Sequence, residues 1–270
     1  MTHTSASWAP ASTAASSAPE PPRVSSPGGV CAIHQPNLFP RLSTLAKLFA
    51  ADCWIALDDV QFARRDYQHR ARLAALDDPG RQQWLTLPIH LPHGRPTLIS
   101  QARLVDPHRS RRTVELLVRQ YYGRGGHRDA VRDVLDAALD ALDTTDRVAR
   151  IARASTLAML AALGWAGEVL DSGRIPTRHS RSERLADLAA ATGSTHYLCG
   201  TGGTRYLDPA PFDAYGISVF PFHTPVDTED PIWCWARRAS GLWALSKMGP
   251  RNLAGRLAAL REGHRLGALL

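Results

Sequence analysis

Hydrophobic residues between positions 31 and 57 form two short continuous runs with an amphipathic segment between them. The runs cover residues 31–33 and 53–57, and each is followed by polar residues, as buried strands often are. Over residues 42–51 the apolar positions recur at intervals of three and four, which predicts a helix with Lys47 on its outer face. Strand, helix and strand predict a βαβ unit, whose parallel strands end at the same edge of a sheet.

A second βαβ unit is predicted between residues 180 and 223. Ser180 and Glu183 have the spacing of a capping box, which opens a helix. Short apolar runs over 197–199 and 217–222 predict two strands, with a turn and a short helix between them. The sequence therefore predicts the α/β class: a mostly parallel sheet built from two βαβ units, with a helical middle segment and C-terminal helices.

The helical middle segment contains three amphipathic stretches. They cover residues 106–123, 131–142 and 146–163, and their apolar residues have the spacing of stripes that face a core. We assign these helices to the scaffold, with His108 and Tyr122 as their contributors to a site. From residue 231 onward several tryptophans also follow helical spacing, which is typical of core packing.

A β-hairpin is predicted between the first βαβ unit and the helices. Residues 62–73 and 84–89 are its strands, and Asp77-Asp78-Pro79-Gly80 is a turn. Such a hairpin brings arginine donors to the edge of the sheet, although a solvated basic face explains any one of them equally well. These arginines are Arg64, Arg65, Arg70 and Arg72.

Residues 1–29 differ from the rest of the chain in composition. They are mostly Ser, Ala, Pro and Thr, which bury too little to offset the entropy of ordering, so we expect a disordered tail before a single α/β domain over 30–270. The tail lacks the basic start and apolar segment of a secretory signal. No apolar run approaches the roughly 18 residues of a membrane helix, and the four cysteines form no CxxC pair, so we expect reduced thiols in a soluble, cytoplasmic protein.

The net charge of +7 comes almost entirely from arginine, since Lys47 and Lys247 are the chain's two lysines. Arginine suits bidentate contacts with phosphate and carboxylate, which favours an anionic ligand. The abundance of arginine and alanine equally fits a GC-rich genome. No block of consecutive basic residues indicates a nucleic-acid groove.

Polar side chains follow both strands of the first βαβ unit. His34 ends the first strand and Asp58 and Asp59 follow the second, so all three are expected at one edge of the sheet, where open α/β sheets bind ligands. An imidazole there is a candidate general base, and a carboxylate could orient it. Adjacent aspartates in an extended segment face opposite ways, so one of the two is expected to reach the site. The alternative is structural: His34 and Asn37 hold a turn, and Asp58 caps a helix.

Three glycines follow the strand at 197–199. Gly200, Gly202 and Gly203 could let backbone N–H groups approach a phosphate or carboxylate, although a tight turn with positive φ explains them without a ligand. Cys199 could serve as a nucleophile, but a cysteine within an apolar strand is more often structural.

Five segments of the chain resemble the WbqC-like protein family in order and spacing, over roughly residues 31 to 260. They are HQPNLFP, ALDDVQFARRDYQHR, WLTLP, SERLADLAAATGSTHYLCGTGGTRYLDPAPFDAYGI and ALSKMGPRNLA. The resemblance implies motif positions at His34, Gln35, Pro36, Asn37, Asp58, Asp59, Gln61, Phe62, Gln68, Arg70, Gly200, Gly202 and Gly203. Arg41, His69 and Ala71 depart from the family's usual residues, which puts the shape of the substrate pocket in doubt.

The family resemblance implies a role in the biosynthesis of surface polysaccharides or secondary metabolites. Our leading hypothesis is a transferase that moves an acyl or aminoacyl group to an amine of an amino sugar or small metabolite. His34, Asp58 and Asp59 are the expected catalytic residues. The donor could be acyl-CoA, a nucleotide-activated group or an aminoacyl-tRNA. The expected substrate-binding residues are Gln35, Asn37, Gln61, Gln68, Arg70, Gly200, Gly202 and Gly203.

Two other functions remain open from the sequence. One is a binding module for a sugar nucleotide or nucleic acid that catalyses no reaction. The weaker one is a metal-dependent hydrolase in which His34, Asp58 and His223 converge, although no close-spaced ligand motif such as HExxH supports it.

Overall fold

The computed structural model describes residues 29–200, 202–203, 206–225 and 230–268, so the expected tail over 1–29 lies outside the described residues except for Gly29. Five parallel strands form the central sheet in the order β7-β2-β1-β8-β9. They are β1 (Val30–His34), β2 (Cys53–Ala56), β7 (Glu168–Asp171), β8 (His196–Gly200) and β9 (Ser218–Phe222). The strand order reverses between β1 and β8, as it does at the centre of doubly wound α/β folds.

Alternate residues of the strands supply the two faces of this sheet. Ala32 and Trp54 join the larger core cluster on one face, together with α1 (Leu42–Ala50), whereas Cys31 and Ile55 join a smaller cluster on the other. The smaller cluster is covered by α5 (Arg181–Ala190) and α6 (Ala210–Asp213). Helices therefore cover both faces, which confirms the predicted α/β class.

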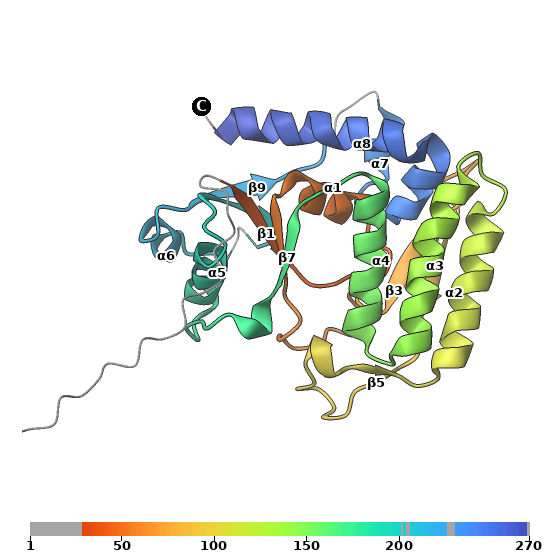
Figure 1. Cartoon of the computed structure of the whole chain (residues 1–270), viewed down its shortest axis with the longest axis horizontal. Helices are drawn as coiled ribbons and strands as arrows, with labels where there is room; N and C mark the ends of the chain where they lie inside the picture. Colours follow the sequence, from red (N-terminus) through yellow and green to blue (C-terminus); the bar gives the residue numbers. More distant parts are fainter. Residues whose placement is uncertain (1–28, 201, 204–205, 226–229, 269–270) are drawn as a thin grey trace, which may run out of the picture.

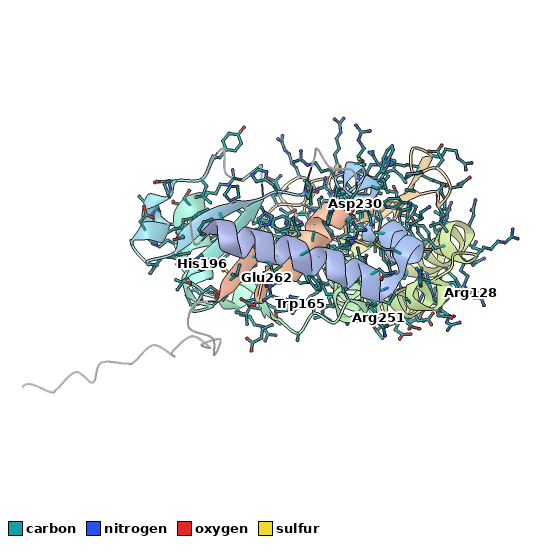
Figure 2. The ribbon with its side chains drawn as sticks, turned by 90° about the horizontal axis from the view of Figure 1, so that it is seen from above. Arg128, Trp165, His196, Asp230, Arg251 and Glu262 are labelled. Atoms are coloured by element: carbon teal, nitrogen blue, oxygen red, sulfur yellow. The ribbon has the colours of Figure 1, made fainter. Side chains whose placement is uncertain are left out.

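The larger core extends away from the sheet into a helical layer. Its helices α2 (Pro107–Tyr122), α3 (Arg128–Thr144) and α4 (Val148–Ala162) lie side by side, at the far end of the molecule from α5 and α6 (Figure 1). After the short α7 (Pro231–Cys234), α8 (Gly241–Ala268) runs along the length of the molecule and packs on α1 (Figure 2). Gly249, at φ 79°, breaks α8 before Pro250.

The predicted hairpin forms, but its strands are shorter than expected. Strand β3 (Arg70–Ala74) pairs antiparallel with β4 (Gln82–Thr86). The expected strand over 84–89 divides at Pro88, which has no N–H for a ladder, and β5 (Ile89–His90) pairs instead with β6 (Arg103–Leu104). Two single turns of 3-10 helix, Ile99–Gln101 and Ser172–Arg174, complete the elements.

Several local predictions were wrong. Ser180 makes no side-chain cap at the start of α5, and Glu183 accepts a hydrogen bond from Arg178 at 3.1 Å instead. Strand β7 was missed, because its four residues lie at the sheet's edge and none is buried. Lys47 is 5% exposed, not on an outer face, because α1 is covered on all sides.

The structure also bears on the membrane and cysteine predictions. Within the described residues, no helix combines the length and apolar character that crossing a bilayer requires. Cys31, Cys53 and Cys199 are buried free thiols, whereas Cys234 is exposed and is not part of the core.

Candidate functional site

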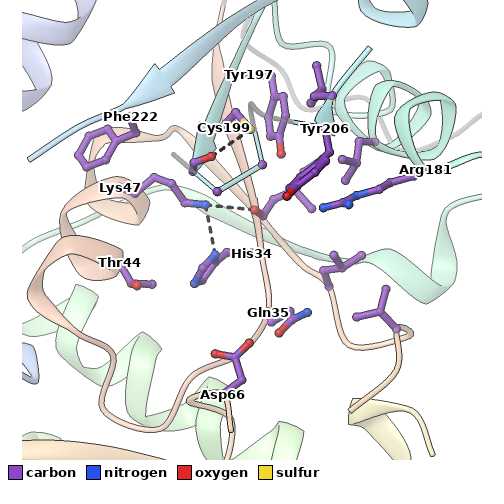
Figure 3. A pocket seen from close by; sticks show the side chains of 18 of the residues that line it. His34, Gln35, Thr44, Lys47, Asp66, Arg181, Tyr197, Cys199, Tyr206 and Phe222 are labelled. Atoms are coloured by element: carbon purple, nitrogen blue, oxygen red, sulfur yellow. Dashed lines mark hydrogen bonds between the residues drawn. The ribbon is translucent and has the colours of Figure 1, made fainter. Parts of the chain in front are cut away.

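A cavity opens at the point where the strand order reverses. It has a volume of about 1050 Å³ and lies at the carboxyl ends of β1 and β8, between α1 and the start of α5 (Figure 3). Side chains from both βαβ units line it, including His34, Lys47 and Arg181. This is the position at which open α/β sheets bind ligands. Of the site residues expected from the sequence, the lining contains His34, Gln35, Gln61, Gly200, Gly202 and Gly203.

Lys47 projects from α1 into the inner end of this cavity and contacts the end of β1. Its Nζ lies 3.2 Å from the carbonyl oxygen of Ile33 and 3.2 Å from Nδ1 of His34 (Figure 3). A tetrahedral amine that donates to both acceptors has one further position, which holds a proton when the amine is charged and a lone pair when it is neutral. Next to it is Gly200, where an added Cβ would lie 4.0 Å from Nζ. Because Lys47 lines the cavity, its amine is accessible to a ligand there.

The contacts of His34 define its tautomer. A charged amine only donates, so Nδ1 of His34 accepts from Lys47 and the ring proton resides on Nε2. Nε2 lies 3.3 Å from Oδ1 of Asn37, an acceptor that suits this proton. Both ring nitrogens are thus engaged within the protein, and the expected partnership of His34 with an aspartate is replaced by Lys47 and Asn37.

Burial shifts the pKa values of this pair toward the neutral forms. The pKa of Lys47 falls from 10.5 to about 8, chiefly because the ammonium group has lost its water. Burial also holds the pKa of His34 well below its usual value, and the nearby charges of Lys47 and Arg41 lower it further. At neutral pH the imidazole is therefore uncharged, and about a tenth of the lysine is a free amine, far more than at its ordinary pKa.

The HQPN loop after β1 is fixed by distant parts of the chain. The carbonyl oxygen of Asn37 accepts from Oγ1 of Thr156 at 2.8 Å, and Oγ of Ser155 accepts from the N–H of Phe39 at 3.0 Å. Phe39 is buried with φ +40°, a left-handed conformation that a bulky residue adopts only when its surroundings impose it. The buried Asn37 thus serves the loop and His34, and it does not line the cavity.

The glycine turn after β8 does not need positive φ, because none of Gly200, Gly202 and Gly203 lies in that region. At Gly203 the reason for glycine is space: an added Cβ would lie 2.7 Å from Sγ of Cys199. All three glycines line the cavity, so the missing side chains leave room beside Lys47. The thiol of Cys199 is buried and its pKa is raised by burial, as expected of a structural cysteine.

Asp58 and Asp59 lie beyond the wall of the cavity, near the end of β7. Oδ1 of Asp59 lies 2.5 Å from Arg184 and accepts from Ser172 at 2.5 Å. The pKa of Asp58 is raised by burial and by the charges of Asp59 and Asp171. The expectation that one of the two aspartates shares a pocket with His34 was wrong, since among the described residues neither lines it.

The remaining site residues expected from the sequence lie in the cavity wall or outside it and make hydrogen bonds within the protein. Gln68 is buried and donates from Nε2 to Oε1 of Gln35 at 2.5 Å, which orients a side chain that does line the cavity. Gln61 donates to the carbonyl of Arg95 at 2.7 Å. Arg70 donates to the carbonyl oxygens of Arg65 and Asp66 and stays outside the cavity, as do Arg64, Arg65 and Arg72. Tyr122 has a structural role, because its buried hydroxyl accepts a hydrogen bond from the N–H of Ala74.

The charge around the cavity is strongly positive. Among its described lining residues Asp66 is the acidic one, against five cations: Arg41, Lys47, Arg181, Arg184 and Arg237. Arg184 is paired with Asp59, whereas Arg41, Arg181 and Arg237 form no ion pair with any described residue. The first N–H groups of α1 cannot bind an anion, because Leu42 and Ser43 donate theirs to backbone carbonyls. Positive charge in the cavity thus comes from side chains.

The residues expected for a metal site do not come together. Within the part of the chain that the structure describes, no group of three or more His, Cys, Asp or Glu side chains could hold a metal ion. His223 is exposed and its N–H faces His264, so the convergence of His34, Asp58 and His223 was a wrong expectation.

Sequence reasoning missed Lys47, Arg41 and Arg181. The signal for Lys47 was present, because it is one of two lysines in the chain and interrupts an apolar segment. The helical pattern assigned it to solvent since periodicity assumes one exposed face, and α1 has none.

Fold and cavity together define a doubly wound α/β protein with a cationic cavity at the crossover of its parallel sheet. The sequence matches the WbqC-like protein family over residues 35–228, and the chain belongs to this family, which confirms the resemblance. It is similar to the uncharacterized protein Rv1507c of Mycobacterium tuberculosis (strain ATCC 25618 / H37Rv), with 24% identity over 188 residues, 70% of this chain and 79% of the relative. No solved structure matches the chain significantly.

Proposed function

We propose that this protein is a group-transfer enzyme that moves an acyl or aminoacyl group from an activated donor to an amine, with Lys47 as the proton acceptor. The observation that carries the proposal is the buried amine of Lys47, which has two directed contacts, lines the cavity and has a pKa of about 8. A base is most effective when its pKa lies near the working pH. Membership of the WbqC-like family supports a setting in polysaccharide or secondary-metabolite assembly as part of this proposal.

In the proposed step, the acceptor's nitrogen attacks the carbonyl carbon of an oxygen ester or thioester. The new carbon–nitrogen bond forms, the bond to the leaving group breaks, and the leaving oxygen or sulfur takes its electron pair. Neutral Lys47 accepts the proton from the nitrogen and returns it to the leaving group. The unpaired guanidinium groups of Arg41 and Arg181 face the same cavity and favour the negative charge that develops on the carbonyl oxygen.

His34 takes a different role from the one expected from the sequence. Its Nδ1 accepts from Lys47, so it positions the amine, while Asn37 holds the opposite side of the ring. Gln35 and Gln61 offer polar side chains at the wall for substrate recognition. Asp59 acts through Arg184, whose side chain lines the cavity.

The test is a transfer assay with acyl-CoA thioesters and aminoacyl-tRNAs as donors and a panel of amino sugars as acceptors, read by mass spectrometry of the amide product. Lys47→Met should lower turnover by about 10² to 10⁴-fold, the usual contribution of a positioned base. The wild-type rate should rise with pH through an apparent pKa near 8, because the base must be neutral. Lys47→Arg keeps a charge but offers no base, and should be equally inactive.

His34→Ala is the matched variant that separates the two residues. It should slow transfer less than Lys47→Met and keep the rise with pH. Loss of that rise in His34→Ala, with Lys47→Met still active, would return the role of base to His34. If no donor and acceptor pair reacts with the wild type and ligands nevertheless bind, the protein is a binding module and the proposal is wrong.

A further inference from the structure

A row of stacked arginine and aromatic side chains leads from the cavity wall onto the hairpin. The guanidinium of Arg41, which lines the cavity, lies 4.1 Å from the centre of the Tyr67 ring. Tyr67 lies 5.6 Å from Trp84, ring centre to ring centre. Arg70 and Arg72 lie 4.3 and 4.5 Å from the Trp84 ring. We call Arg41, Tyr67, Trp84, Arg70 and Arg72 the arginine–aromatic row.

The pleat of the hairpin turns this row outward. Ala71, Leu73 and Leu85 are fully buried in the core on one face of β3 and β4. Arg70, Arg72 and Trp84 alternate with them, so they lie on the opposite face, where each is half-buried. The hairpin therefore has an apolar face that secures it and a second face made of cations and an aromatic ring.

The positive charge of this face is not neutralised. Among the described residues, Arg41, Arg70 and Arg72 form no ion pair, and Nε of Arg41 and of Arg72 is buried without a hydrogen-bond partner. Arg64 and Arg65, in the loop before β3, are exposed, as is Arg237 on the cavity wall. Such a surface attracts a chain of negative charges, and its rings with the guanidinium planes that lie over them are flat surfaces on which bases can stack.

We propose that the arginine–aromatic row binds the single-stranded 3′ end of an RNA, whose terminal nucleoside enters the cavity. Phosphodiesters are the anions that arginine rows contact, and bases stack on aromatic rings in single-strand binding sites. The row continues past the cavity and over the hairpin, which fits several linked nucleotides better than one nucleotide held in the cavity. This inference rests on the proposed function and specifies its donor as an aminoacyl ester of RNA.

The reaction with this donor is balanced. The acceptor amine attacks the aminoacyl carbonyl carbon, an amide bond forms, and the ester bond to the terminal ribose breaks. The ribose oxygen leaves with the electron pair and takes the proton that Lys47 received from the amine. The products are the amide and an RNA with a free terminal hydroxyl.

The experiment measures binding of a 5′-fluorescein single-stranded RNA of about ten nucleotides ending in CCA, by fluorescence anisotropy, within the usual size of single-strand sites. Trp84→Ala should weaken binding by about 5- to 150-fold, the range for loss of one stacked base. Trp84→Phe keeps a ring face and should retain most of the affinity. Arg72→Gln should reduce the slope of log affinity against log salt by about 0.7, the value for one phosphate of a single strand.

Arg119→Gln is the matched control, since it removes one arginine that is paired with Glu115 on α2, and it should leave binding unchanged. Melting curves must show that Trp84→Ala is folded, and Trp84→Phe and Arg72→Gln decide the question if it is not. Equal affinity of wild type, Trp84→Ala and Arg72→Gln for the RNA would overturn the proposal. So would binding of coenzyme A or ADP with no measurable affinity for the RNA, which would indicate a small-nucleotide donor.

Failure of this inference can be told from failure of the proposed function. Lys47→Met should bind the RNA about as tightly as the wild type while losing transfer. If the RNA does not bind but Lys47-dependent transfer from a thioester occurs, the claim that the row binds RNA is wrong and the transfer function stands. If the RNA binds through the row but Lys47→Met transfers normally, Lys47 is not the proton acceptor, and the claim that the row binds RNA stands.

Discussion

The two halves of the sheet's carboxyl edge have opposite electrostatic designs. Beyond β1 and β8, Lys47, Arg41 and Arg181 face a cavity and form no ion pair with a described residue. Beyond β2 and β7, the carboxylates of Asp59 and Asp171 are matched by Arg184 and Arg153. The cations of the first half are therefore available to a ligand, whereas the charges of the second half pair with each other.

This difference explains why neighbouring polar clusters at one sheet edge need not share a function. Unpaired charge that is buried or half-buried costs stability, so a protein retains it where it serves binding or catalysis. Paired charge at the same edge holds loops in place. Arg184 connects the two halves: its ion pair with Asp59 belongs to the second half, and its side chain lines the cavity of the first.

The largest effect on stability is expected from Lys47→Met. The pKa of Lys47 is about 8 in the folded chain against 10.5 ordinarily, so folding with a charged Lys47 costs about 3 kcal/mol. The cost is fully present below pH 8 and disappears as the pH rises from 8 to 10.5, because the unfolded chain then also loses the proton. Lys47→Met should therefore be more stable than the wild type at pH 7, with a shrinking advantage above pH 8.

Urea unfolding of both proteins at several pH values measures this difference. Subtracting one unfolding free energy from the other removes the contribution of groups that titrate identically in both proteins. Cys53, whose burial raises its pKa to about 12, is one such group. A variant that is less stable than the wild type at pH 7 would show that the amine of Lys47 is held by favourable contacts, and that the two halves are alike.

Asp59→Asn should lower the free energy of unfolding, by less than Lys47→Met raises it. It leaves Arg184 partly buried without its carboxylate, which should cost about 2 kcal/mol of unfolding free energy. Asp129→Asn is the control, because its pair with Arg132 is exposed on α3 and should contribute about 0.5 kcal/mol or less. Transfer should fall by less than about tenfold, against 10² or more for Lys47→Met. An inactive but fully stable Asp59→Asn would instead place this half of the edge in catalysis.

The smallest effect is expected from deleting residues 1–28. Their composition offers no apolar pattern to bury, so the melting temperature and the transfer rate should be unchanged within error. A clear drop in either quantity would mean that the tail adds a third set of contacts to the two halves.

The sequence predicted most of the sheet because β1, β2 and β8 are nearly buried, and continuous apolar runs bounded by polar turns are their direct signature. It could not predict β7, whose residues 168–171 are exposed or half-buried and pair with one neighbour only. It also overestimated the Ser180 cap, since Arg178 recruits Glu183 and Asp187 from the same helix.

What the sequence alone determined is the α/β class, the two βαβ units and the placing of His34 and the glycine turn at one edge. These follow from local patterns, because burial and turn chemistry act over a few residues. Only the tertiary structure decided that Lys47 is buried beside His34, and that Asp59 is ion-paired with Arg184 away from the cavity. The physical reason is that α8 and the sheet enclose α1 from opposite sides, and that the turn after β7 and helix α5, both distant in sequence, bring Ser172 and Arg184 to Asp59.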